Sequence, residues 1–177
     1  NIYCSVPLGA GLGASATLCV GLTRWLLFMG WLGADQLYEF SRQLEDLFHG
    51  ESSGVDIAVA ISGEPLRFQR PSVREVFRPS WRPNWYLSYS GKRGVTSECV
   101  AKVKRLWELH PEQAKRIDED MHQAVKLAEK ALLLDESQGL GILADSIQKA
   151  RSCFDRWGLT SGEVGDQLSW LMSQGAL

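Results

Sequence analysis

The chain has 177 residues, of which 45% are hydrophobic, and a formal net charge of −2 at pH 7. This composition supports the packed core of one large domain or two small ones. The nearly balanced charge makes nucleic acid and anionic membranes poor default partners. The cysteines at positions 4, 19, 99 and 153 form no CxxC pair, so we expect reduced thiols in a cytoplasmic protein.

The first elements are predicted to be a strand, a glycine-rich loop and an apolar helix. The strand covers residues 2–6, the loop 7–13 and the helix 14–29. The helix is apolar on nearly every side, which predicts that it is fully buried. It is shorter than the roughly 20 residues that a membrane span requires and contains Arg24, so we expect a core helix and no membrane segment.

A second helix is predicted within residues 33–50, with Gly50 closing its end. Its other face is polar. A loop over 51–54, a short helix-like turn over 55–63 and a strand over 65–69 follow. The side chains expected to form the apolar face of the second helix are Leu37, Phe40, Leu44, Leu47 and Phe48.

The second half of the chain is predicted to be rich in helices. Residues 71–83 carry arginine, proline and tryptophan, which indicates a connecting segment. Residues 85–90 are predicted to form a strand. Four helices are expected after it, over residues 96–109, 112–134, 137–157 and 162–174. The predicted fold class is therefore α+β in two parts, residues 1–82 with strands and helices and residues 83–177 with mainly helices.

The stretch PLGAGLGASA, residues 7–16, places glycines between a strand and a helix. Backbone N–H groups in such a turn, together with the positive end of the helix, favour an anion such as phosphate. A tight turn that binds nothing is the alternative. No lysine follows Gly13, which argues against a P-loop, and Asp35 opens another helix instead of ending a strand, which argues against a dinucleotide fold.

Two motifs together resemble the GHMP kinase superfamily. The pattern P-x-G-x-G-L-G-[SA]-S-A is similar to its second signature, and EDLFHGESSGVDIAV, residues 45–59, resembles the mevalonate kinase branch. Eleven residues separate Glu45 from Asp56, as they separate the metal-binding glutamate and the catalytic aspartate of that family. The resemblance continues along the chain and implies a two-domain kinase fold whose first and third signatures would lie outside this sequence.

The resemblance implies ATP and Mg²⁺ as cofactors. It makes Ser15 and Glu45 the magnesium ligands and Asp56 the catalytic residue that accepts or polarises the proton of the attacking hydroxyl. The residues implied to bind the nucleotide are Pro7, Gly9, Ala10, Gly11, Leu12, Gly13, Ala14, Ser15 and Ala16. Those implied to bind the substrate are His49, Gly50, Ser53, Gly54 and Thr96.

Each of these roles has a plainer alternative. Ser15 and Asp56 lie where helix caps occur, and Glu45 suits a solvated helix face. The apolar neighbours of Asp56 favour a poorly solvated functional carboxylate. His49 lies four residues after Glu45 and could bind metal with it, but a cluster of two residues is a weak metal signal.

Three positions depart from the family pattern: Ala14, Ser52 and Ile57. Ala14 replaces a serine and Ser52 a common proline, which we interpret as mild changes. Ile57 replaces a frequent asparagine and bears on the substrate more than on the reaction.

The implied activity is ATP-dependent phosphorylation of mevalonate. A sibling kinase that acts on phosphomevalonate, homoserine or a sugar, and an inactive relative that senses a ligand, stay open as alternatives. The expected partner is a small-molecule substrate, with no nucleic acid and no membrane, and self-association as a homodimer is a further expectation. The chain alone is expected to be inactive.

Overall fold

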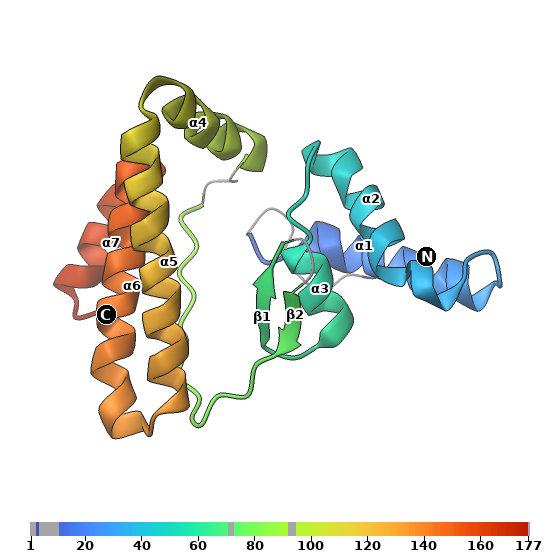
Figure 1. The fold of residues 1–177 in the computed structure, drawn as a ribbon, viewed down its shortest axis with the longest axis horizontal. Coiled ribbons are helices and arrows are strands. Elements are labelled where there is room, and N and C mark those ends of the chain that lie inside the picture. Colours follow the sequence, from blue (N-terminus) through green and yellow to red (C-terminus); the bar gives the residue numbers. More distant parts are fainter. Residues whose placement is uncertain (1–2, 4–10, 71–72, 92–94, 177) are drawn as a thin grey trace. The chain divides into compact units, whose positions relative to one another are not determined.

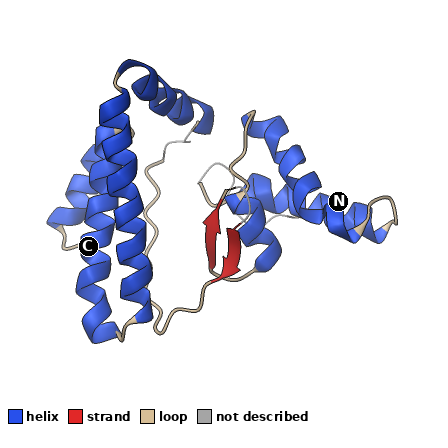
Figure 2. Cartoon of the chain, viewed as in Figure 1, coloured by secondary structure: helices blue, strands red, loops and turns tan. Residues whose placement is uncertain are grey.

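The computed structural model describes residues 3, 11–70, 73–91 and 95–176 (Figure 1). The chain divides into two compact units. The first contains residues 1–78 and 92–97, and the second contains residues 79–91 and 98–177. The described residues are mostly helical with one small sheet (Figure 2), which is compatible with the predicted α+β class.

The first unit consists of three helices and a β-hairpin. Strands β1 and β2 are antiparallel, with Leu66 opposite Val76, and β2 lies in a segment that was predicted to be only a connection. The predicted strand over residues 2–6 lies outside the described residues. In chain order the elements are α1 (Ala14–Phe28), a 3-10 turn (Ala34–Gln36), α2 (Leu37–His49), α3 (Val55–Ser62), β1 (Leu66–Gln69) and β2 (Val73–Val76).

The core of the first unit is small and is built mainly on one face of α1. Its buried residues are Ala16, Cys19, Val20 and Ile57. The prediction that α1 is buried on all sides is wrong for this structure, because Trp25 and other large apolar side chains of the helix are exposed. Only the face that packs against α2 and α3 is covered, since these are the elements that contact α1.

The buried face of α2 agrees with the prediction only in part, because it combines apolar and polar side chains. Leu37, Phe40 and Leu44 are half-buried, and Leu44 packs against the core as expected. Leu47 is 82% exposed and Phe48 is 60% exposed, whereas Ser41 is fully buried and Glu45 is 3% exposed. The reason lies in the partner, because α1 presents the hydroxyl of Thr23 to α2, where Ser41 donates a hydrogen bond to it at 2.9 Å. Polar side chains of α2 can therefore be buried because α1 offers them hydrogen-bond partners.

The second unit begins with an irregular segment and continues with the four predicted helices. The prediction of a strand over residues 85–90 is wrong: the segment has no strand partner among the described residues, and Trp85, Tyr86 and Leu87 are exposed. Before it, Ser80 donates its N–H to the Leu132 carbonyl at 2.8 Å. The helices are α4 (Thr96–Leu109), α5 (Pro111–Leu133), α6 (Glu136–Arg156) and α7 (Glu163–Ser173).

Helices α5 and α6 form the main packed pair of the second unit. The backbones approach closely near Gly139, where an added Cβ would overlap the Ala131 carbonyl oxygen and lie 2.9 Å from Trp81 Nε1. Trp81 donates a hydrogen bond to the same carbonyl at 3.0 Å. Gly139 therefore sets the separation of the two helices. Within the described part of the chain, no helix is both long enough and apolar enough to cross a membrane.

Candidate functional site

Polar side chains of α1 meet polar side chains of α2 at steps of four residues. Because residues four apart share one helix face, the two helices present matching rows that run in opposite directions. We call this row the polar seam. Its pairs are Ser15 with His49, Cys19 with Glu45, and Thr23 with Ser41.

Ser15 is the second residue of α1 and does not cap the helix. The N-cap is Gly13, whose φ of 69° lies in the left-handed region that favours glycine. The Ser15 hydroxyl instead shares a hydrogen bond with His49 Nε2 at 3.2 Å. The helix start is therefore built by backbone conformation, and the serine hydroxyl is directed into the polar seam.

Glu45 is buried on the seam and has no cationic neighbour among the ion pairs of the described residues. The expectation of a solvated helix face is wrong for this residue. The Ser52 hydroxyl donates a hydrogen bond to Glu45 Oε2 at 2.5 Å. Burial raises the pKa of the Cys19 thiol, and the nearby Glu45 carboxylate raises it further. A buried carboxylate that forms no ion pair within the described part of the chain suits a divalent ion, for which carboxylate and hydroxyl oxygens are ordinary ligands.

The loop between α2 and α3 is held by side chains of α2 and of the hairpin region. Ser52, which is 6% exposed, donates its backbone N–H to Asp46 Oδ1 at 2.6 Å. The Ser52 carbonyl accepts from Arg70 at 2.8 Å. Tyr38 donates its hydroxyl to the Gly54 carbonyl at 3.4 Å, and Gly54 N–H donates to Ser52 Oγ at 3.0 Å. These bonds fix the segment that leads to Asp56.

Asp56 is the second residue of α3 and lies beside Gly13, the N-cap of α1. The N-cap of α3 is Gly54, whose φ is 79°, and no side chain caps the helix. A Cβ placed on Gly13 would lie 4.0 Å from Asp56 Cβ, so the two helix starts are adjacent. The prediction that Asp56 is poorly solvated is wrong, because its side chain is exposed. Its apolar neighbours Ile57 and Ala58 are buried on the other side of the short helix.

The remaining predicted residues occupy several different places. Gly11 and Leu12 are exposed just before α1, whereas Ala14 and Ala16 lie in its first turn and Ala16 is buried. Pro7, Gly9 and Ala10 lie outside the described residues. Gly50 ends α2 with a φ of 77°, and exposed Ser53 accepts a hydrogen bond from Val55 N–H at 3.3 Å. Thr96 is the first residue of α4 and is exposed.

Glu45 and His49 were also considered as a pair that binds metal, but no third histidine, cysteine, aspartate or glutamate joins them among the described residues. No group of three or more histidine, cysteine, aspartate or glutamate residues is placed to hold a metal ion in the described parts of the chain. His49 instead bonds to Ser15. The structure thus brings Ser15, Glu45, His49, Gly54 and Asp56 into one region of the first unit.

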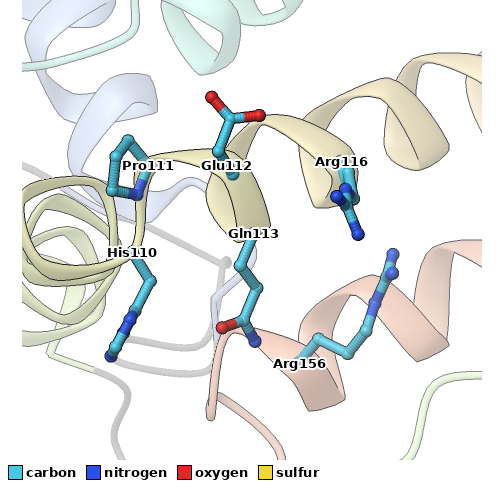
Figure 3. Close-up of a pocket in the computed structure, with 6 residues that line it drawn as sticks. All are labelled: His110, Pro111, Glu112, Gln113, Arg116 and Arg156. Atoms are coloured by element: carbon cyan, nitrogen blue, oxygen red, sulfur yellow. The ribbon is translucent and has the colours of Figure 1, made fainter.

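A cavity of about 550 Å³ lies in the second unit, at the start of α5 and the end of α6. Figure 3 shows the guanidinium groups of Arg116 and Arg156 facing each other, while Glu112 points away from them. Arg156 is already paired with Asp120 at 2.7 Å. None of the predicted site residues lines this cavity. Its lining residues are His110, Pro111, Glu112, Gln113, Arg116 and Arg156.

Comparison with known proteins identifies the class to which the first unit is related. Residues 1–64 match the family of GHMP kinases, N terminal domain. This match includes α1, α2 and α3, so every pair of the polar seam lies within it. The resemblance to GHMP kinases is thereby confirmed.

Within that class the chain is similar to curated mevalonate kinases. It is 29% identical over its whole length to the mevalonate kinase of Pyrococcus horikoshii, of which it covers 53%, and 28% identical to that of Thermococcus onnurineus, of which it covers 54%. Over 58% of the chain it is 38% identical to the mevalonate kinase of Candida albicans, of which it covers 29%. The chain spans about half the length of the archaeal relatives. No solved structure matches it.

Sequence reasoning missed the residues that hold the loop. Ser52, Tyr38 and Arg70 were not among the predicted site residues, and the change at Ser52 was interpreted as mild. The run of Ser52 and Ser53 before a glycine is a signal for local hydrogen bonding. The signal does not reveal that Ser52 bonds to two acidic side chains of α2, because this depends on how the loop folds back.

Proposed function

We propose that this chain is part of an ATP-dependent kinase that phosphorylates the primary hydroxyl of mevalonate. The observation that carries the proposal is the adjacency of the two helix starts, at Gly13 and Gly54, with Asp56 beside the glycine turn. Helix starts favour phosphate, and a carboxylate beside them can accept or polarise the proton of an attacking hydroxyl. The similarity to curated mevalonate kinases supports the choice of substrate.

Two residues at one end of the polar seam, Ser15 and Glu45, fit a divalent cation. In this proposal Glu45 and Ser15 would hold Mg²⁺, and the exposed turn at Gly11 to Gly13 would receive the phosphates of ATP. When bound, Mg²⁺ would neutralise charge on the transferring phosphoryl group. The chain's own contribution is to keep the Glu45 carboxylate buried and to leave Asp56 open to solvent, where a small substrate can reach it.

The substrate loop in this proposal comprises His49, Gly50, Ser53 and Gly54, with Thr96 contributing from the start of α4. The two units would correspond to the N-terminal and C-terminal domains of the kinase. The free thiols among the described cysteines, Cys19, Cys99 and Cys153, agree with a cytoplasmic enzyme.

The test is a substrate profile of the complete gene product with ADP formation as the readout. Mevalonate, phosphomevalonate, homoserine and galactose are supplied one at a time with ATP and Mg²⁺. We expect turnover on mevalonate at least about 100-fold above the others, because a site built to bind one substrate's polar groups rejects analogues strongly. Turnover on galactose or homoserine with none on mevalonate would contradict the proposal.

A further inference from the structure

Ser52, in the loop after α2, is hydrogen-bonded by the side chains of two successive acidic residues of that helix, Glu45 and Asp46. Its hydroxyl donates to Glu45 Oε2 at 2.5 Å, and its N–H donates to Asp46 Oδ1 at 2.6 Å. Asp46 is itself held by Arg42 at 3.0 Å. Consecutive residues of a helix point in different directions, so both can reach Ser52 only because the loop lies across the end of α2.

The same hydroxyl also organises the loop itself. Ser52 Oγ accepts a hydrogen bond from Gly54 N–H at 3.0 Å, while its own proton goes to Glu45. A serine hydroxyl has one proton and two lone pairs, so both bonds form together without conflict. Both Ser52 and Glu45 are buried, which makes the loss of either partner costly.

The geometry points to Ser52 as a positioning residue that links the Glu45 carboxylate to the start of α3, where Asp56 lies. This inference rests on the proposed function, since it assigns Glu45 to the metal and Asp56 to the substrate. With one oxygen of Glu45 occupied by the Ser52 hydroxyl, the orientation of the carboxylate is set before any cation binds. Second partners of this kind orient metal ligands and tune metal affinity.

Gly54, two residues after Ser52, lies where only glycine fits without strain. Its φ of 79° lies in the left-handed region, and a Cβ at this position would overlap the Tyr38 hydroxyl. Tyr38 donates to the Gly54 carbonyl while Ser52 accepts from its N–H. The N–H and the carbonyl of Gly54, the N-cap of α3, are thus both bonded to side-chain hydroxyls, and one of these, that of Ser52, is also bonded to Glu45.

The test compares Ser52→Ala, Ser52→Thr and Ser41→Ala in the complete gene product. Ser52→Ala removes the hydroxyl but keeps the N–H that bonds to Asp46, and Ser52→Thr restores a hydroxyl. Ser41→Ala is the matched control, because Ser41 is also a buried serine of the first unit, and its hydroxyl bonds to Thr23 and to no acidic side chain among the described residues. The readouts are amide hydrogen exchange at residues 50–56, the KM for Mg²⁺ and kcat at saturating Mg²⁺.

We expect Ser52→Ala to accelerate amide exchange at Gly54 and to raise the KM for Mg²⁺, each by about tenfold, with kcat at saturating Mg²⁺ changed by less than about twofold. Protection of the amide at position 52 should persist through Asp46. Ser52→Thr should recover most of both effects. Ser41→Ala should lower the unfolding temperature while leaving the KM for Mg²⁺ within about twofold of the wild-type value.

The inference is overturned if Ser52→Ala leaves Mg²⁺ dependence unchanged, even with faster exchange at Gly54, or if Ser41→Ala raises the KM for Mg²⁺ equally. A wild-type protein that phosphorylates no alcohol would contradict the proposed function alone. In that case exchange at Gly54 and the Mg²⁺-induced shift in unfolding temperature, which require no turnover, still decide whether Ser52 positions Glu45.

Discussion

The two main helix pairs of the molecule bury different chemistry. Between α1 and α2 a row of polar residues, Glu45, Ser41 and Thr23, is buried beside apolar contacts such as that of Leu44 with the core. Between α5 and α6 the buried residues are mostly small and apolar, and the ion pairs lie at the rim, as between Arg156 and Asp120. Burying apolar side chains stabilises a fold, whereas burying a carboxylate costs free energy of folding. A buried carboxylate is therefore expected where it serves binding or catalysis.

This contrast separates the positions that should control activity from those that should control stability. Changes at the proposed site residues of the first unit, Glu45 and Asp56, are expected to alter metal dependence or catalysis with small effects on unfolding. Changes in the second pair are expected to alter unfolding alone. The following predictions test this division, beginning with the largest effect.

Asp56→Asn is expected to lower kcat by about 10²–10⁴-fold, because the amide cannot accept or stabilise the proton of the substrate hydroxyl. The affinity for ATP should stay nearly unchanged, since the nucleotide is assigned to the glycine turn. Asp56 is exposed and makes no capping bond, so the free energy of unfolding should change by less than about 1 kcal/mol. Steady-state kinetics and thermal unfolding measure the two quantities, and a wild-type kcat would remove Asp56 from the chemistry.

Gly139→Ala should destabilise the second unit by about 1–3 kcal/mol, because the new methyl group meets the Ala131 carbonyl and Trp81. Gly141→Ala is the matched control. Gly141 lies in the same helix with open space around its Cα, so an added methyl should stabilise the helix by about 0.5–1 kcal/mol. Denaturant unfolding gives both values, and equal effects at the two glycines would disprove the close approach of α5 and α6.

Glu45→Gln should weaken Mg²⁺ dependence while sparing the fold. The amide keeps an oxygen that can accept from Ser52 but loses the charge that suits a divalent cation. We expect the KM for Mg²⁺ to rise by about tenfold and the free energy of unfolding to change by no more than about 1 kcal/mol, because the amide oxygen keeps the hydrogen bond from Ser52 while the cost of burying a charge is removed. A clear loss of stability would show that the carboxylate serves the fold.

Asp120→Asn should have the smallest effect and should depend on pH. The hydrogen bond from Arg156 lowers the pKa of the Asp120 carboxyl. A lowered pKa contributes stability above the ordinary aspartate value, about 3.9, and this contribution is lost as the pH falls through the lowered value. Unfolding temperatures of wild type and variant should therefore differ slightly at pH 7 and converge once the pH falls below the lowered pKa of Asp120. A difference that persists in acid would exclude the ion pair as its source.

The sequence by itself determined the helices and the resemblance to GHMP kinases. Periodicity located α5 and α6 to within a residue or two, because their sides differ in polarity along many turns. The short β2 strand was missed, and the strand expected over residues 85–90 did not form, since strand pairing depends on a distant neighbour.

Only the tertiary structure decided which face of α2 is buried and how the site is held together. Apolar spacing predicted the half-burial of Leu37, Phe40 and Leu44 but also favoured Leu47 and Phe48, which are exposed. Ser41 and Glu45 are buried instead, because α1 presents Thr23 and Cys19 at matching steps. The role of Ser52 likewise depends on a loop that crosses the end of α2. A helix pattern records which residues share a face, whereas the partner surface determines which face is buried.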